Sequence, residues 1–464
     1  MEANANTIKT MGIISNEVYN KNKAIIDYFK DDYDIDGNKI IKFIEGTTYK
    51  VLDHTGDSTL TGFNALLLQE EGTKNYVIAF RGTDSILDGL VDLAIGGHFN
   101  PQYNDAVAFV NKALSNPDIN KNNLTLTGHS LGAILTQQVG ATLSIPGYAF
   151  NPYGTNALIR YPNLGNILLD ILAAVGAGSA IEYAKNNIVN ISYQDDGALN
   201  GDPLSNFATN LTSEHLGDFI PVWGPNIGLS GHFMKPLNDA INTYNTLLQG
   251  IDYKKLSEAF FANAISPYDD FNRTKNTLQN LITGNANATI EIMTNHSISQ
   301  IKSLAETNTA YAYALDNMNG FVVHNTSYAN TTDYTKVSDI FLQKRAEALY
   351  YAMNPDAYEN NSDSAYIVNA PDVGIRLGHT SFGFPSDKHK VIFGGDLPNT
   401  KFLLGGDSGD DFIFGMGGND ELVGNAGNDY LEGGTGDDSL HGSDDKNKII
   451  TCNLYVSPKN KKVA

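Results

Sequence analysis

Residues 124–136 read LTLTGHSLGAILT, and the GxSxG pattern from Gly128 to Gly132 decides which fold the surrounding chain is expected to adopt. LTLT has the character of a strand, whereas LGAILTQQVG has that of a helix. The two glycines leave room for a strained strand-to-helix turn with Ser130 at its tip. GxSxG alone is a weak signal in a chain with 44 glycines, but strand, turn and helix together predict a nucleophilic serine.

Short β-rich runs alternate with helical patterns from about residue 45 to residue 235. Such alternation predicts a mostly parallel sheet with helices on both faces. At the start of the helix that follows Ser130, the amide of Leu131 is expected to face a developing oxyanion. The other runs are YVIAF at Tyr76, DAVAFVNKAL at Asp105, GYAF at Gly147 and NIVNISY at Asn187.

The run YVIAF is followed by Arg81, Gly82 and Thr83. FRGT, with TGHSLG about 45 residues later, resembles the class 3 lipases of the α/β-hydrolase fold. The resemblance implies that Thr83 is the second oxyanion donor and that residues 85–96 form an amphipathic lid helix. An ordinary core-packing helix is the alternative for these residues.

A catalytic base is expected downstream of Ser130, because hydrolases of this fold place serine, acid and histidine in that order. His232, in GLSGHFM, follows the last predicted strand at a distance suited to a loop that reaches back to the serine. His215 is the alternative. His129 is expected to be structural, because a residue next to the nucleophile in a sharp turn points elsewhere.

The acid is expected on the loop after NIVNISY, where Asp195, Asp196, Asp202 and Asp218 occur. Asp202, in NGDPLS, resembles the Gly-Asp-Pro context of the lipase family and is the favoured acid, with Asp218 in GDFIP as the alternative. The expected chemistry is ester hydrolysis through an acyl-enzyme, which requires no cofactor.

Near the C-terminus a period of nine residues appears, with Gly at position 4, Asp at position 6 and an aliphatic residue at position 8. It resembles the RTX nonapeptide repeat, which implies a calcium-binding parallel β-roll. Two repeats form one coil, so about two calcium sites are expected, with Asp411 facing Asp429 and Asp420 facing Asp438. The repeats are GDSGDDFIF, GMGGNDELV, GNAGNDYLE and GGTGDDSLH, starting at Gly406, Gly415, Gly424 and Gly433.

The composition restricts the possible partners and the compartment. With 31 Lys plus Arg against 52 Asp plus Glu, the net charge of −21 argues against nucleic-acid binding. Cys452 is the only cysteine, the N-terminus does not read as a secretory signal, and the apolar run 167–181 is interrupted by Asp170, so no transmembrane helix is expected. The RTX resemblance implies export by type I machinery to a calcium-rich exterior, although the tail after Gly442 is not recognisable as an export signal.

These patterns predict an α/β-hydrolase domain at 1–240, a segment of unknown role at 241–390, a β-roll at 391–445 and a tail at 446–464. The function that they favour is a secreted serine carboxylic-ester hydrolase, a triacylglycerol lipase that acts at a lipid interface. Phospholipase A1 is the alternative. A third hypothesis, from a different class, is a calcium-dependent surface or adhesion protein with an inactive hydrolase domain.

Overall fold

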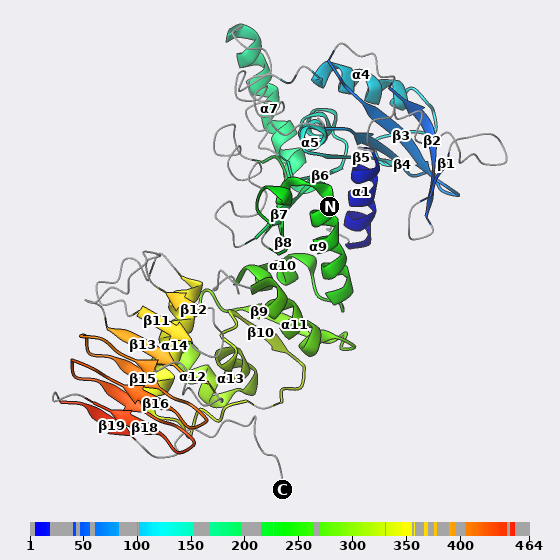
Figure 1. The fold of residues 1–464 in the computed structure, drawn as a ribbon. Helices are drawn as coiled ribbons and strands as arrows, with labels where there is room; N and C mark the ends of the chain where they lie inside the picture. The colour runs from blue at the N-terminus through cyan, green and yellow to red at the C-terminus, as the bar shows by residue number, and fades with distance from the viewer. Residues whose placement is uncertain are drawn as a thin grey trace. The chain divides into compact units, whose positions relative to one another are not determined.

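A computed structural model shows two compact units, Met1–Thr246 and Leu247–Ala464 (Figure 1). No helix in the described part of the chain is both long and apolar enough to cross a bilayer. The structure describes residues 5–18, 40–42, 47–55, 61–82, 100, 102–152, 167–195, 215–225, 227–262, 270–329, 331–354, 357, 366–369, 375–377, 389–395, 404–442 and 446–450.

The first unit is built on an eight-stranded sheet whose spatial order follows the chain, from β1 to β8. Neighbours from β1 to β4 are antiparallel, and those from β4 to β8 are parallel. The strands expected at YVIAF, LTLT, GYAF and NIVNISY are confirmed. The strands are β1 (Ile40–Lys42), β2 (Thr48–His54), β3 (Ala65–Glu70), β4 (Tyr76–Phe80), β5 (Leu124–His129), β6 (Gly147–Phe150), β7 (Ile188–Gln194) and β8 (Asp218–Trp223).

Helices cover both faces of this sheet, as the sequence predicted (Figure 1). Successive side chains of a strand point to opposite faces, and β5 shows the consequence. Leu126 packs in a core cluster with residues of α4 and α5, whereas the Thr127 hydroxyl lies 2.8 Å from that of Ser15 in α1. The helices of this unit are α1 (Ala5–Glu17), α4 (Tyr103–Leu114), α5 (Leu131–Leu143), α7 (Ile167–Asn187), the 3-10 helix η1 (Gly228–His232) and α9 (Met234–Leu247).

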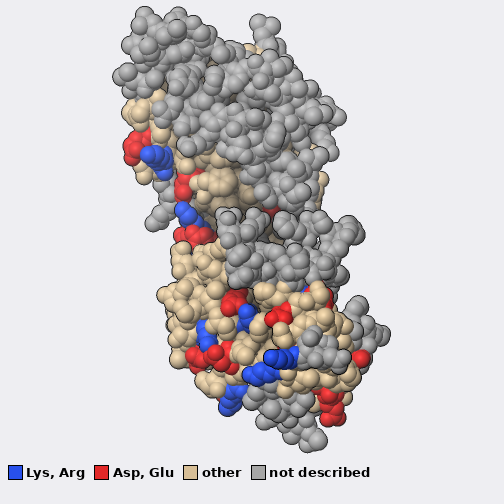
Figure 2. Space-filling model, turned by 90° about the vertical axis from the view of Figure 1, so that its left-hand side faces the viewer, with Lys and Arg blue, Asp and Glu red and all other residues tan. Residues whose placement is uncertain are grey.

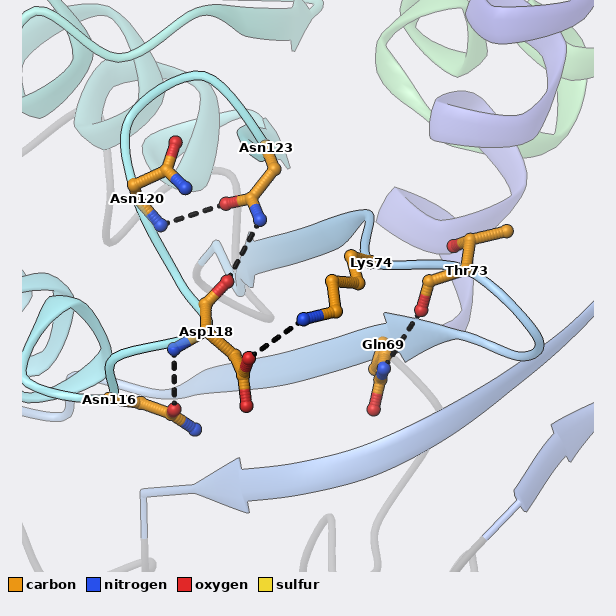
Figure 3. A network of polar contacts seen from close by, with 7 residues as sticks. All are labelled: Gln69, Thr73, Lys74, Asn116, Asp118, Asn120 and Asn123. Atoms are coloured by element: carbon orange, nitrogen blue, oxygen red, sulfur yellow. Dashed lines mark hydrogen bonds and ion pairs between the residues drawn. The ribbon is translucent and has the colours of Figure 1, made fainter.

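Polar contacts close the amino ends of β4 and β5, on the edge of the sheet opposite Ser130 (Figure 3). Lys74, in the turn before β4, forms a 3.0 Å ion pair with Asp118 in the loop before β5. Asn123 donates to the Asp118 carbonyl, and Asn116 accepts from its amide. Because both charged groups are exposed, this pair fixes loop geometry more than it stabilises the fold.

In the second unit, the helical segment and the β-roll share one core. Phe341 of α14 makes edge contacts with Phe393 and Phe414 of the roll, with ring centroids 5.9 and 5.2 Å apart. The described helices that follow Leu247 and the strands of the roll therefore pack together within the second unit. Its other elements are α10 (Tyr253–Ala262), α11 (Asp270–Ile282), β9 (Thr289–Ile292), α12 (Ile298–Thr307), α13 (Thr309–Asp316), β10 (Phe321–His324) and α14 (Asp339–Met353).

The repeats form two stacks of short parallel strands. Aliphatic residues at position 8 fill the thin space between the stacks, including Ile413, Leu422 and Leu431. The roll continues past its predicted end at residue 445, because GSDDKNKII retains Gly442 and Ile449 at positions 1 and 8. One stack consists of the parallel strands β11 (Tyr366–Asn369), β13 (Lys390–Phe393), β15 (Phe412–Phe414), β17 (Tyr430–Glu432) and β19 (Lys448–Ile450), with β12 (Ile375–Leu377) added antiparallel to β11. The opposite stack consists of β14 (Leu404–Gly405), β16 (Glu421–Val423) and β18 (Ser439–His441).

The face of the second unit that is visible in Figure 2 carries acidic and basic side chains next to each other. Ion pairs of this unit include Lys344 with Glu347 and Lys336 with Asp333. On the part of this face that the structure describes, the strong net acidity of the chain does not form a patch of one sign. The aspartates inside the roll differ from these surface carboxylates because they are buried.

Candidate active site and repeat sites

Ser130 lies at a strained turn between β5 and α5, with φ 56° and ψ −122°. A Cβ at Gly132 would come within 2.2 Å of the Phe80 carbonyl, and one at Gly128 within 2.4 Å of the Gly132 carbonyl. Both glycines of GxSxG are therefore required by the close approach of β4, β5 and α5. A sharp, strained turn between a strand and a helix is the backbone setting that a nucleophilic serine has in hydrolases of this fold.

The Ser130 hydroxyl lies 3.1 Å from Nε2 of His232. A serine that begins a helix usually caps the first turn with its hydroxyl, but Ser130 makes no such cap bond. Both residues are buried, at 5% and 2% exposure, although 102 positions separate them in the chain. This is the geometry of a serine paired with a general base.

Of the two predicted oxyanion donors, the structure describes one. Leu131 is the first residue of α5, so its amide is among the helix N-terminal donors that have no acceptor within the helix. The positive end of the helix dipole adds to the attraction for an anion there. Thr83 and the predicted lid at residues 85–96 lie outside the described residues.

The carboxyl ends of parallel strands meet at one edge of a sheet. The candidate acids therefore differ in whether they lie at this edge, which carries Ser130, or at the opposite one. Asp195 directly follows β7, is 2% exposed, and accepts from the amide of Ile227 in the loop that carries His232. Asp218, the alternative acid, is exposed at the amino end of β8, opposite Val189 at the start of β7. This register argues against Asp218. His215 precedes β8 at the same edge.

Asp196 and the favoured acid Asp202 lie outside the described residues. Asp195 is thus the described carboxylate whose position best suits an acid, because the loop after β7 opens at the same edge as the serine. Sequence reasoning included Asp195 among the candidates but preferred the Gly-Asp-Pro context of Asp202. Asp195 stands out only once β7 is seen to end at Gln194, directly before it.

The main chain of His232 is held by two buried side chains. Asn151, which follows β6, donates from Nδ2 to the carbonyls of His232 and Gly231 at 2.8 and 3.0 Å. His129 contacts the same His232 carbonyl through Nε2 at 2.7 Å. Because a carbonyl only accepts, His129 carries a proton on Nε2. The structural role expected for His129 is thus a hydrogen bond that holds the main chain of His232.

In the roll, each predicted aspartate pair joins adjacent coils. The Asp411 amide donates to Asp429 Oδ1, and the Asp420 amide to Asp438 Oδ1, both at 3.0 Å and 18 residues apart. The pairing predicted from the repeat length is therefore what the structure shows. The Asp429 amide in turn donates to Oδ1 of Asn447, which occupies position 6 of the degenerate fifth repeat.

The carboxylates of the repeats are packed against glycine and shielded from water. A Cβ at Gly406 or Gly424 would come within 2.2 Å of Oδ2 of the aspartate in the same repeat, which explains glycine at position 1. Asp438 Oδ2 is buried and accepts no hydrogen bond from the described residues. Burial, followed by the charges of Asp407 and Asp429, raises the pKa of Asp411.

These observations fit calcium, a hard cation that takes carboxylate and carbonyl oxygens together. The Gly409 and Gly418 carbonyls point at the next coil, where they would lie 2.1 and 1.6 Å from a Cβ at position 4. In the described part of the chain, no three His, Cys, Asp or Glu side chains cluster as metal ligands. A site here would therefore depend on main-chain carbonyls as much as on carboxylates.

The first coil differs from the others. The Lys390 ammonium lies 3.2 Å from Asp407 Oδ2, and both side chains are largely buried. Both oxygens of Asp411 accept main-chain hydrogen bonds, from Lys390 and from Asp407. A lysine thus supplies positive charge where the first coil meets the helical part of the unit, so the four predicted aspartates are not equivalent.

The sheet order, the strained serine turn and the serine–histidine pair define a lipase-like α/β-hydrolase, and the stacked nonapeptides define an RTX-type roll. Residues 10–160 match the Tle-like phospholipase domain. Residues 405–440 and 423–450 match the RTX calcium-binding nonapeptide repeat. The first unit is therefore similar to a Tle-like phospholipase domain, and the C-terminal repeats are of the RTX type, a class of repeat that typically binds calcium and implies secretion.

No curated protein matches the sequence. Among solved structures, the mono- and diacylglycerol lipase from Aspergillus oryzae is 14% identical with a TM-score of 0.35, over 49% of this chain and 83% of that chain. A triacylglycerol lipase from Penicillium expansum is 15% identical with a TM-score of 0.29, over 48% of this chain and 83% of that chain. The fold assignment rests on the sheet and the serine turn and not on these distant likenesses.

Proposed function

We propose that the protein is a secreted serine hydrolase that cleaves carboxylic esters of lipids. The observation that carries the proposal is the 3.1 Å contact between Ser130 Oγ and His232 Nε2 at a strained, glycine-flanked turn. In this role His232 accepts the serine proton, and Ser130 attacks the ester carbonyl to form an acyl-enzyme. The Leu131 amide stabilises the oxyanion, with Thr83 as the second donor, and water then releases the acid.

Asp195 is the acid that we propose for this triad, since it is buried at the carboxyl edge and bonded to the loop of His232. Replacing Asp195 by Asn should lower kcat by about 10³- to 10⁴-fold, because the imidazole would lose the anion that orients it and stabilises its charged form. Hydrolysis of a soluble p-nitrophenyl ester measures the effect. Asp218→Asn, at the far edge, is the matched control and should keep full activity.

Asp202→Asn decides between this proposal and the sequence-based choice. If that variant loses activity while Asp195→Asn retains it, the acid is Asp202, and Asp195 only anchors the loop.

The substrate that we favour is a phospholipid, because residues 10–160 match a phospholipase domain. Purified protein with calcium should release fatty acid from phosphatidylcholine vesicles about tenfold faster, or more, than from emulsified triolein. A tenfold ratio corresponds to about 1.4 kcal/mol of transition-state discrimination between the two esters. Free fatty acid released per minute is the measurement. The reverse order would establish triacylglycerol lipase activity instead, and analysis of the lysophospholipid product would show whether the first-position ester is cleaved.

Calcium, in this proposal, is a structural ion of the roll and takes no part in ester cleavage. The carboxylates of Asp411, Asp420, Asp429 and Asp438, with repeat carbonyls, would hold it between coils. The bound ion would offset the repulsion among buried carboxylates where calcium is abundant. We further propose that type I machinery exports the chain, so that the roll folds outside the cell.

A further inference from the structure

We infer that Asn151 is a positioning residue for the catalytic histidine, an inference that rests on the proposed function. Asn151 is 0% exposed and has φ 45°, a left-handed conformation that asparagine tolerates better than most residues. Its amide is fully used: Nδ2 donates to two carbonyls of η1, and Oδ1 accepts from the Tyr193 amide at 2.8 Å. The side chain therefore ties β7 to the segment that ends in His232.

The acceptors show why this tie bears on catalysis. The last carbonyls of a short helix have no hydrogen-bond donors within the helix, so the last carbonyls of η1 need donors from other segments. Asn151 and His129 both donate to the His232 carbonyl, at 2.8 and 2.7 Å. These donors stand at the ends of β6 and β5, and β5 also delivers Ser130. The base is thus placed from the same strands as the nucleophile, and not by its own loop alone.

Removing the amide should move the imidazole without removing any reacting group. Asn151→Gly keeps the left-handed backbone and deletes both hydrogen bonds to η1. Asn151→Asp keeps the shape of the side chain and the oxygen that accepts from the Tyr193 amide. It replaces the Nδ2 donor by a second oxygen, which would face the two carbonyls of η1 without a hydrogen to donate. Displacement of a catalytic group by an ångström can cost about 100-fold in rate. Both variants should therefore lower kcat on a soluble p-nitrophenyl ester by about 10- to 100-fold and leave KM within about twofold.

Asn190 is the matched control. It is also 0% exposed, and its Nδ2 likewise donates to two main-chain carbonyls, those of Leu216 and Asp218. These lie at the amino edge of β8, away from Ser130. Asn190→Ala should lower the melting temperature, as loss of buried hydrogen bonds does, while kcat below the transition stays at the wild-type value.

A double-mutant cycle separates positioning from a general loss of structure. In a His232→Ala background, Asn151→Gly should cause no further loss, because the residue acts through that histidine. An equal loss in both backgrounds, or wild-type kcat in Asn151→Gly, would overturn the positioning role. If His232→Ala keeps wild-type activity, the proposed function fails, whereas full activity of Asn151→Gly beside an inactive His232→Ala overturns only the role of Asn151.

Discussion

Replacing Ser130 by Ala is expected to lower kcat for ester hydrolysis by about 10⁴-fold or more, because the acyl-enzyme cannot form without the hydroxyl. Alanine retains the Cβ, so the steric strain of the backbone at φ 56° stays the same and the melting temperature should change little. The Gly132–Phe80 packing that fixes the turn is also untouched. Initial rates on vesicles and on a soluble ester measure the loss.

The chain offers a matched control at the other end of the same helix. Ser144 follows α5, also has φ 56°, and is exposed. Ser144→Ala removes a hydroxyl from a serine that also has a positive φ but lies at the opposite end of α5 from Ser130, so hydrolysis should stay at the wild-type rate. Equal rates for the wild type and Ser130→Ala would contradict the nucleophile assignment.

Chelation of calcium is expected to unfold part of the roll, because its core is a single row of aliphatic side chains between buried carboxylates. The loss should be uneven. Strands β13 and β15 pack on Phe341 of α14, so they keep some amide protection from exchange, whereas β16 and β18 have no such support among the described contacts and should lose it. Hydrogen exchange of the full chain, with calcium and with chelator, measures this.

Asp429→Asn tests whether the ion is held as proposed, since it keeps an oxygen for the Asp411 amide but removes a charge. The calcium concentration at half-maximal protection should rise by about tenfold or more, because affinity follows ligand charge. Asp437→Asn, which removes an exposed charge from a neighbouring repeat, should leave it unchanged. Identical exchange with and without calcium would contradict a structural role for the ion.

Local pattern was sufficient for the elements that place the nucleophile. β4, β5, α5 and β6 were predicted because short β-rich runs alternate with helical patterns in this part of the sequence, and the two glycines of GxSxG mark the turn between β5 and α5. The nine-residue period likewise fixed which aspartates face each other between coils. In each case the determining signal lies within about 20 residues of sequence.

The remaining features depend on contacts between distant segments. The position of Asp195 becomes informative only when the end of β7 and the start of β8 are known, because register decides which carboxylates share an edge with Ser130. Asn151 gave no sequence signal, since the carbonyl that it holds belongs to a residue 81 positions away. The shared core of α14 and the roll was missed for the same reason, because Phe341 meets Phe414 only after both elements form.

The most direct test of the central claim is to treat the calcium-loaded protein with a fluorophosphonate and to locate the adduct by peptide mass spectrometry. The account predicts a single stoichiometric adduct on Ser130, absent in Ser130→Ala and formed far more slowly in His232→Ala, because the 3.1 Å contact with the histidine activates the hydroxyl. No adduct on Ser130, or one that forms at the same rate without His232, would contradict it and would favour a binding protein with an inactive hydrolase domain.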